Sequence, residues 1–300
     1  MCILRGRAGY YRLPPVTRIT GLVLILTFVC HAALAHPELQ LQIDQLTAQL
    51  ELEPDNVDLL LKRGDLHRRH DSADLARTDF NRVREIQPEN QTVDWFEGRL
   101  GVQTGDPREG VRYLDRFLLN NPGHVIALQN RAEGYWLLNQ PLLAAKDFQT
   151  VIRESDNPAP SVYASCALAY IAAGSNYYSA ALDIVKKGLS LFPGEVTLTA
   201  FATDLSLARL EVEGADIFIN SLPAAVLKLP QWQTRIALLE CEAGNMASAS
   251  EWFSSYPVAP LRSQFSSGLL SEKWLARLAT DPSADNCQAA AIEILNSHGR

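Results

Sequence analysis

Apolar residues recur along most of this chain at the three- and four-residue spacing that places them on one face of a helix. The segment 36–53 shows this pattern clearly, with Leu39, Ile43 and Leu50 among its apolar positions and Pro54 directly after it. A proline cannot continue helical hydrogen bonding, so the pattern predicts one helix that ends before Pro54. The chain shows no alternating β pattern of any length. The sequence therefore predicts an all-α fold.

A period of 34 residues organises the middle of the chain. Five columns of similar residues repeat at this interval: Gly64, Gly98 and Ala132; Ala76, Gly110 and Ala144; Phe80, Leu114 and Phe148; Val83, Phe117 and Val151; and Pro54, Pro88 and Pro122. Small residues let two antiparallel helices approach closely, and large apolar residues fill the space beside them. Residues 105–107 and 139–141 supply turns within the helix pairs. A single pair cannot bury its apolar face, so the pairs are expected to stack.

These columns resemble the tetratricopeptide repeat (TPR), whose small residues fall at repeat positions 8 and 20, with large apolar residues at 24 and Pro at 32. The first positions here are Val57, Gln91 and Val125. The resemblance implies a right-handed solenoid of antiparallel helix pairs.

The repeat pattern weakens towards both ends of the chain. We expect TPR-like repeats over 36–193, clearest over 54–193, with a one-residue slip in the fourth unit. Degenerate helix pairs are predicted over 194–257, and a C-terminal helical cap over 258–300, because terminal elements of solenoids cover the exposed end of the stack.

The first 35 residues have the features of a secretory signal peptide. Residues 1–18 carry four arginines and no acidic residue, an apolar run follows from Ile19, and Ala33 and Ala35 place small residues at the end. This order predicts cleavage after Ala35 and a periplasmic or secreted protein without a membrane span after cleavage. An uncleaved membrane anchor is the alternative, although the apolar stretch is short for a span.

Composition and charge narrow the class of partner. The chain is 47% hydrophobic and 20% charged, which argues against a disordered chain. Its net charge is −7, and removal of the four leader arginines leaves 23 basic and 34 acidic residues, a net charge of −11. Nucleic acid favours a basic surface, so a protein or peptide partner is expected instead.

Three of the five cysteines lie after the predicted leader. Cys241 and Cys287 are a possible disulfide pair, since an oxidising compartment permits one. Cys166 lies in an apolar helical stretch and is expected to be a small core residue.

The sequence offers one weak candidate for a metal or catalytic site, the pair His67 and His70. His67 and His70 can share a helix face, but no third ligand is indicated, and His67 fills repeat position 11, which is usually aromatic in the TPR family. Phosphate-binding, dinucleotide-binding and nucleophile-elbow motifs are all missing from the sequence. We therefore expect no catalytic site, no metal and no cofactor.

The TPR resemblance implies a binding groove lined by positions 2, 5, 9 and 12 of the first helices. Carried onto this sequence, these positions give the candidate binding residues Arg68, Trp95, Arg99, Gln129, Glu133 and Trp136, with Tyr163 and Tyr170 from the fourth repeat. Aromatic side chains beside polar ones are typical of binding hot spots. The same aromatics are equally consistent with plain core packing.

These observations favour a non-catalytic extracytoplasmic TPR scaffold or adaptor that binds a protein or peptide in its concave groove. One alternative is a structural subunit of a cell-envelope complex that uses its convex face. Another is a hydrolase with an unrecognised C-terminal site.

Overall fold

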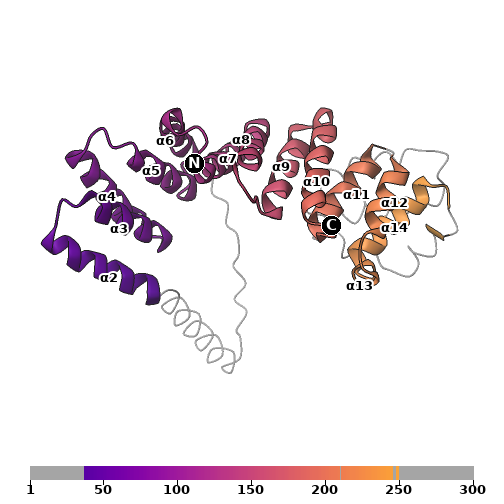
Figure 1. Ribbon diagram of the computed structural model, residues 1–300, viewed down its shortest axis with the longest axis horizontal. Helices are drawn as coiled ribbons and strands as arrows, with labels where there is room; N and C mark the ends of the chain where they lie inside the picture. Colours follow the sequence, from indigo (N-terminus) through magenta and orange to yellow (C-terminus); the bar gives the residue numbers. More distant parts are fainter. Residues whose placement is uncertain (1–36, 210, 246–247, 250–300) are drawn as a thin grey trace, which may run out of the picture. The chain divides into compact units, whose positions relative to one another are not determined.

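The computed structural model describes residues 37–209, 211–245 and 248–249 (Figure 1), so the predicted leader and C-terminal cap lie outside the described residues. Regular structure within these ranges is helical, and they contain no strand. The all-α prediction is therefore confirmed. The chain divides into two compact units after Asn90. We call the described residues before this boundary unit 1 and those after it unit 2.

Unit 1 is built from three helices: α2 (Pro37–Leu52), α3 (Val57–Arg69) and α4 (Ala73–Ile86). Helix α2 packs against α3, and α3 packs against α4. Helix α2 ends before Pro54, as its pattern predicts, and takes the place of the second helix of a preceding repeat.

Unit 2 continues the same helix-pair architecture. Its elements are α5 (Thr92–Gln103), α6 (Pro107–Asn120), α7 (Val125–Leu137), α8 (Pro141–Glu154), α9 (Pro160–Ala173), a 3₁₀ turn η1 (Ser175–Tyr177), α10 (Tyr178–Leu191), α11 (Val196–Ala208), α12 (Val212–Asn220), α13 (Ala224–Leu227) and α14 (Pro230–Glu242). Each helix from α5 to α11 packs against the next helix along the chain. The structure is therefore a helical solenoid within this unit.

Four of the five 34-residue columns lie in the core or pack against it, whereas the proline column is exposed. Ala76, Phe80 and Val83 of α4 have no exposed surface, and Leu114, Ala132, Ala144 and Val151 are equally enclosed in unit 2. A Cβ added to Gly64 would lie 2.4 Å from the Phe80 ring. The small residue at repeat position 8 is thus required by the close approach of the paired helix.

Two arginines link the two helices of their pairs in the same way. They lie 68 residues apart, which is two repeat periods. Arg63 of α3 donates from Nε and Nη2 to the Asp79 carboxylate of α4, at 3.0 and 2.6 Å. Arg131 of α7 donates from the same atoms to Asp147 of α8, at 2.8 and 2.7 Å. We call each of these two-pronged pairs an arginine clamp. Both aspartates are buried, so the clamps are internal parts of the hairpins.

Each clamp also reaches the helix before its own pair. Nη1 of Arg63 donates to Thr47 of α2 at 3.2 Å, and Nη1 of Arg131 donates to Asp115 of α6 at 2.8 Å. Burial works against the charge of Arg131, but its hydrogen bonds to Asp147 and Asp115 hold its pKa above the ordinary value. A single side chain therefore ties three successive helices together.

The repeat spacing changes at the fourth repeat. Helix α9 begins 35 residues after α7, whereas α10 begins 37 residues after α8, because the turn η1 precedes α10. The predicted slip of one residue is therefore right for the first helix and wrong for the second. This difference decides which side chains of α9 line the site described below.

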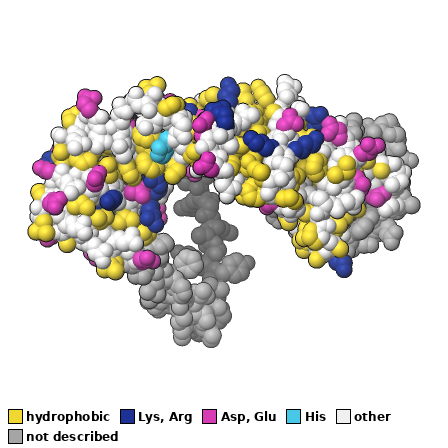
Figure 2. Space-filling model, in the orientation of Figure 1, with side chains coloured by type: hydrophobic (Ala, Val, Ile, Leu, Met, Phe, Trp, Pro, Cys, Tyr) yellow, Lys and Arg dark blue, Asp and Glu magenta, His cyan; other side chains and the backbone are white. Residues whose placement is uncertain are grey.

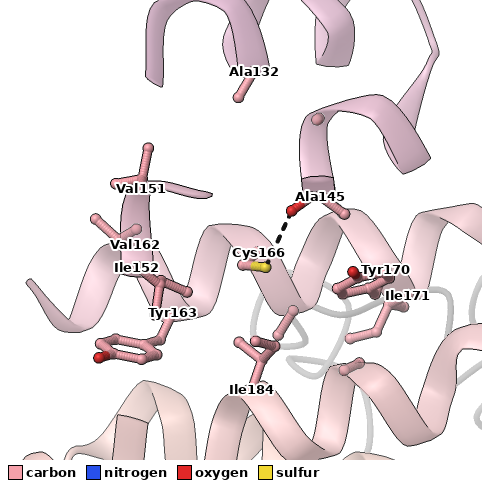
Figure 3. Packing of buried hydrophobic residues seen from close by; sticks show 14 of the residues in the cluster. Ala132, Ala145, Val151, Ile152, Val162, Tyr163, Cys166, Tyr170, Ile171 and Ile184 are labelled. Carbon is pink, nitrogen blue, oxygen red and sulfur yellow. Dashed lines mark hydrogen bonds between the residues drawn. The ribbon is translucent and has the colours of Figure 1, made fainter. Parts of the chain in front are cut away.

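The main core of unit 2 surrounds Cys166 of α9. Its thiol donates to the carbonyl oxygen of Ala145 at 3.5 Å, and Val162 and Ile184 lie nearby (Figure 3). Cys166 has no exposed surface, and burial raises the pKa of its thiol to about 12. The prediction of a small core residue is confirmed, and Cys166 is a free cysteine.

Candidate functional site

The first helices of unit 2 lie next to one another along the stack. Helix α5 contacts α7, and α9 contacts α11, whereas the second helices α6 and α8 make no comparable contact in the part of the chain described. Between α7 and α9, comparable contact is also missing among the described helices, and a pocket opens there.

This pocket has a volume of about 390 Å³, and we call it the α7–α9 pocket. Its lining comes from three helices: Gln129, Glu133 and Trp136 of α7, Phe148 of α8, and Ser161, Val162, Ser165 and Leu168 of α9. The structure thus brings together three of the residues predicted from the TPR resemblance. A volume of this size is at the lower end of the range for small-ligand pockets and accommodates one or two amino-acid side chains.

Burial separates the rim of the pocket from its floor. Glu133, Trp136 and Ser161 are exposed, and the indole of Trp136 keeps 41% of its surface accessible. Val162 is buried, and Phe148 and Leu168 are partly buried. An apolar floor beneath a partly polar rim can take up an apolar group and hold a polar group at the entrance.

Four polar side chains line the pocket, two from α7 and two from α9. Gln129 and Glu133 lie four residues apart on α7, and Ser161 and Ser165 lie four residues apart on α9. Within the described residues, none of these four side chains makes a hydrogen bond or an ion pair. They are available to donate to or accept from a bound partner.

Comparison with known proteins shows that α7 and α8, two of the helices around the pocket, belong to a known repeat family. Residues 97–160 match the sequence profile of the tetratricopeptide repeat family, and the 34-residue columns continue on the N-terminal side of that range. The chain therefore contains tetratricopeptide repeats over residues 97–160. No curated protein sequence matches it significantly.

Solved structures share the fold of this TPR protein. The C-terminal part of a TPR repeat-containing protein from Cytophaga hutchinsonii is 14% identical, with a TM-score of 0.53, over 83% of this chain and 94% of that one. PilF of Pseudomonas aeruginosa is 12% identical, with a TM-score of 0.50, over 74% of this chain and 97% of that one. At these identities the likeness concerns the fold alone.

Trp95 and Arg99 of this TPR protein lie on α5 and have internal partners. The indole Nε1 of Trp95 donates to Asn130 Oδ1 at 3.2 Å, and its ring centroid lies 4.8 Å from that of His124. The guanidinium carbon of Arg99 lies 5.2 Å from the centroid of the same indole. Trp95 therefore joins α5 to α7, and a role in binding stays a prediction for both residues.

Tyr163 and Tyr170 are enclosed in the core and do not line the pocket. They are 1% and 6% exposed, and Figure 3 shows both among the buried residues around Cys166. Burial raises the pKa of both hydroxyls. Ser161 and Leu168 occupy the pocket-facing positions of α9 instead. The reason is that α9 begins 35 residues after α7, one residue more than the repeat period. Both tyrosines therefore contribute to core packing, and a role in binding stays a prediction for them.

Arg68 belongs to unit 1, apart from the residues of the pocket. Its Nε donates to Asp65 Oδ1 on the same helix at 2.9 Å. Its predicted role in binding stays a prediction.

Cys241 of α14 is buried and disulfide-bonded. Cys287 lies outside the described residues, so its predicted pairing with Cys241 stays a prediction.

The described residues contain no group of three or more His, Cys, Asp and Glu side chains placed to hold a metal ion. None of their helices combines the length and the hydropathy that a transmembrane span needs.

Proposed function

We propose that this TPR protein is a non-catalytic extracytoplasmic scaffold that binds a protein or peptide segment in its concave groove, at the α7–α9 pocket. The observation that carries this proposal is the convergence of Gln129, Glu133 and Trp136 with two serines of α9 around one open cavity. A solvent-exposed tryptophan beside polar groups that lack internal partners is the composition expected at a binding hot spot.

Substitution of Trp136 tests this function. A photo-crosslinking amino acid placed at Ser161 is expected to capture a partner in the native compartment, and mass spectrometry then identifies the captured segment. Trp136→Ala is expected to weaken binding of the purified partner at least tenfold, because truncation of a hot-spot aromatic costs about 2 kcal/mol or more. Leu143→Ala is the matched control, since Leu143 is similarly exposed, at 39%, and lies outside the pocket on α8. Equal binding by the wild type and the Trp136→Ala variant would contradict the proposal.

Extracytoplasmic location is supported by the order of charges and apolar residues in 1–35 and by the disulfide-bonded state of Cys241. The test is the mass and N-terminal sequence of the protein recovered from its native source. We expect a chain that begins at His36. A chain that begins at Met1 and is recovered from the cytosol would contradict this part of the proposal.

The competing function is that of a structural subunit of a cell-envelope complex, bound through the second helices of its repeats. Exposed apolar side chains on these helices favour it. Leu119 of α6 is 79% exposed, Leu191 of α10 is 56% exposed and Ile217 of α12 is 68% exposed. Hydrophobic side chains also appear among charged ones on the face shown in Figure 2. If this function holds, Leu119→Ser with Ile217→Ser abolishes co-purification with a membrane complex, and Trp136→Ala leaves it intact. The hydrolase alternative concerns residues 258–300, which lie outside the described residues.

A further inference from the structure

Glu133 is the charged residue among those that line the α7–α9 pocket. Its carboxylate has no ion pair or hydrogen bond within the described residues. Arg131 on the same helix is held by Asp147 and Asp115, and Arg99 of α5 lies over the Trp95 ring. The pocket therefore presents an uncompensated negative charge at its rim, which attracts a cation.

The apolar lining restricts which cation fits. Beside Glu133, the exposed indole of Trp136 and the partly buried Leu168 offer hydrophobic surface, and Val162 lies below them. Lysine and arginine side chains bury an aliphatic stem on such a surface and keep the charged end at its edge. An aromatic ring face also attracts a cation directly.

The remaining polar groups suit a polypeptide better than a small amine. An extended backbone segment brings N–H and C=O groups that need partners once water is displaced. Gln129 of α7 and the hydroxyls of Ser161 and Ser165 on α9 can supply donors and acceptors from both sides of the pocket. The acidity of the whole chain, −11 without the leader, adds long-range attraction for a basic segment.

We propose that the α7–α9 pocket binds the side chain of a lysine or arginine in an extended segment of a partner protein. The cationic end pairs with the Glu133 carboxylate, and the aliphatic stem packs against Trp136 and Leu168. This inference rests on the proposed function, because it names the chemistry of the partner that the groove binds.

Titration with synthetic peptides tests the inference on the full mature chain. The probes are end-blocked heptapeptides Gly-Ala-Leu-X-Leu-Ala-Gly, in which X is lysine, arginine, norleucine or glutamate. Binding is followed by NMR through the indole N–H resonance of Trp136, which is assigned from its loss in Trp136→Phe. The lysine and arginine peptides are expected to bind at least tenfold more tightly than the norleucine peptide, because norleucine cannot form the charge-assisted hydrogen bond to the Glu133 carboxylate. The glutamate peptide is expected to leave the resonance unmoved.

A substitution of the carboxylate provides the decisive comparison. Glu133→Gln keeps the shape of the side chain and removes its charge. It is expected to lower the affinity for the lysine peptide to that for the norleucine peptide. Glu213→Gln is the matched control, since Glu213 is an exposed residue of α12 without a partner within the described residues, and it is expected to change nothing.

Three results would overturn the inference: equal binding of the lysine and norleucine peptides, a lysine preference that survives in Glu133→Gln, and no shift with any peptide. Binding of n-butylammonium as tight as that of the lysine peptide would also overturn it, because the backbone would then contribute nothing. Failure here is distinct from failure of the proposed function. If only the inference fails, Trp136→Ala still weakens binding of the native partner. If the proposed function fails, Trp136→Ala leaves that binding unchanged.

Discussion

At the residue scale, the turns of the helix pairs α3–α4, α5–α6 and α7–α8 each contain one left-handed position. Asp71, Gly105 and Asn139 all have positive φ, at 55°, 85° and 56°, and they lie 34 residues apart. Glycine, asparagine and aspartate tolerate this conformation better than other residues. The repeat therefore includes a column that is defined by backbone conformation, although its three side chains differ.

Substitution of Gly105 tests this column. A Cβ added at Gly105 would meet nothing within 4 Å, so Gly105→Ala changes only the backbone preference. It is expected to lower the free energy of unfolding by about 1 kcal/mol, the approximate cost of a left-handed conformation for an ordinary residue. Gly105→Asn is expected to cost less, and urea denaturation followed by circular dichroism measures both. Equal stability of the alanine variant and the wild type would contradict the account.

His67 makes the stability of unit 1 depend on pH. Burial lowers its pKa below the ordinary 6.5, and Arg63 and His70 lower it further, whereas Asp79 opposes them. The unfolded chain then takes up a proton at a higher pH than the folded chain does, so acidification favours unfolding. Stability is lost as the pH falls from about 6.5 towards the folded pKa.

The prediction is a steeper fall in the free energy of unfolding between pH 7 and pH 5 for the wild type than for His67→Tyr. Tyrosine is the residue at the same position of the third repeat, Tyr135, and it carries no charge in this range. Thermal melts of both proteins across this range provide the measurement. Parallel curves would show that His67 does not contribute.

At the element scale, the arginine clamps hold the helix pairs in register. In both, an arginine of the first helix binds an aspartate 16 residues later and also reaches the preceding helix. Asp204 of α11 and Arg235 of α14 form a similar pair in which both side chains are buried, with contacts of 2.8 and 2.7 Å. Buried ion pairs therefore recur between helices that pack against each other, whether these are successive, as in the clamps, or separated along the chain, as α11 and α14 are.

Removal of one clamp partner is expected to be costly. Arg131→Met leaves the buried Asp147 without its main partner and is expected to lower the free energy of unfolding by about 3 kcal/mol. Arg131→Met combined with Asp147→Leu is expected to recover most of that loss, since no buried charge is then left unpaired. Arg112→Met is the control, because its pair with Glu109 is exposed and is expected to contribute less than about 1 kcal/mol. A loss no larger than that of the control would show that the clamp is not important for stability.

The helix pairs could be predicted from the sequence, whereas the clamps could not. Buried columns such as Ala76 and Phe80 repeat in residue type and therefore stand out. Arg63 and Asp79 look like ordinary surface charges, and the second repeat has Glu97 and Tyr113 at the corresponding positions. Only the recurrence of the same two residues 68 positions later could have indicated their pairing.

The candidate site was predictable only where the register was unbroken. Gln129, Glu133 and Trp136 follow from the regular spacing of the third repeat. Ser161 and Leu168 do not follow from the repeat spacing, because in the fourth repeat the first helix begins 35 residues after its counterpart in the third and the second helix begins 37 residues after. Repeat alignment alone cannot reveal two different shifts within one hairpin.

At the scale of the whole molecule, the cysteines provide a test of processing and pairing together. If residues 1–35 are removed and Cys241 pairs with Cys287, the mature chain holds one free thiol, that of Cys166. Ellman's reagent is then expected to count no thiol in the folded protein, one after denaturation and three after denaturation with reduction. Three thiols without reduction would contradict the disulfide, and five after reduction would contradict removal of the leader.

The enclosure of Cys166 has a consequence for the order of assembly. If the chain is exported and Cys241 pairs with Cys287, the thiol of Cys166 can mispair with either of them while the chain is still open. That risk ends once α8 and α10 have packed over α9, since the thiol is then out of reach of any other cysteine. Under these conditions N-to-C synthesis and export would favour correct pairing, because the middle of the solenoid can bury Cys166 before Cys287 emerges.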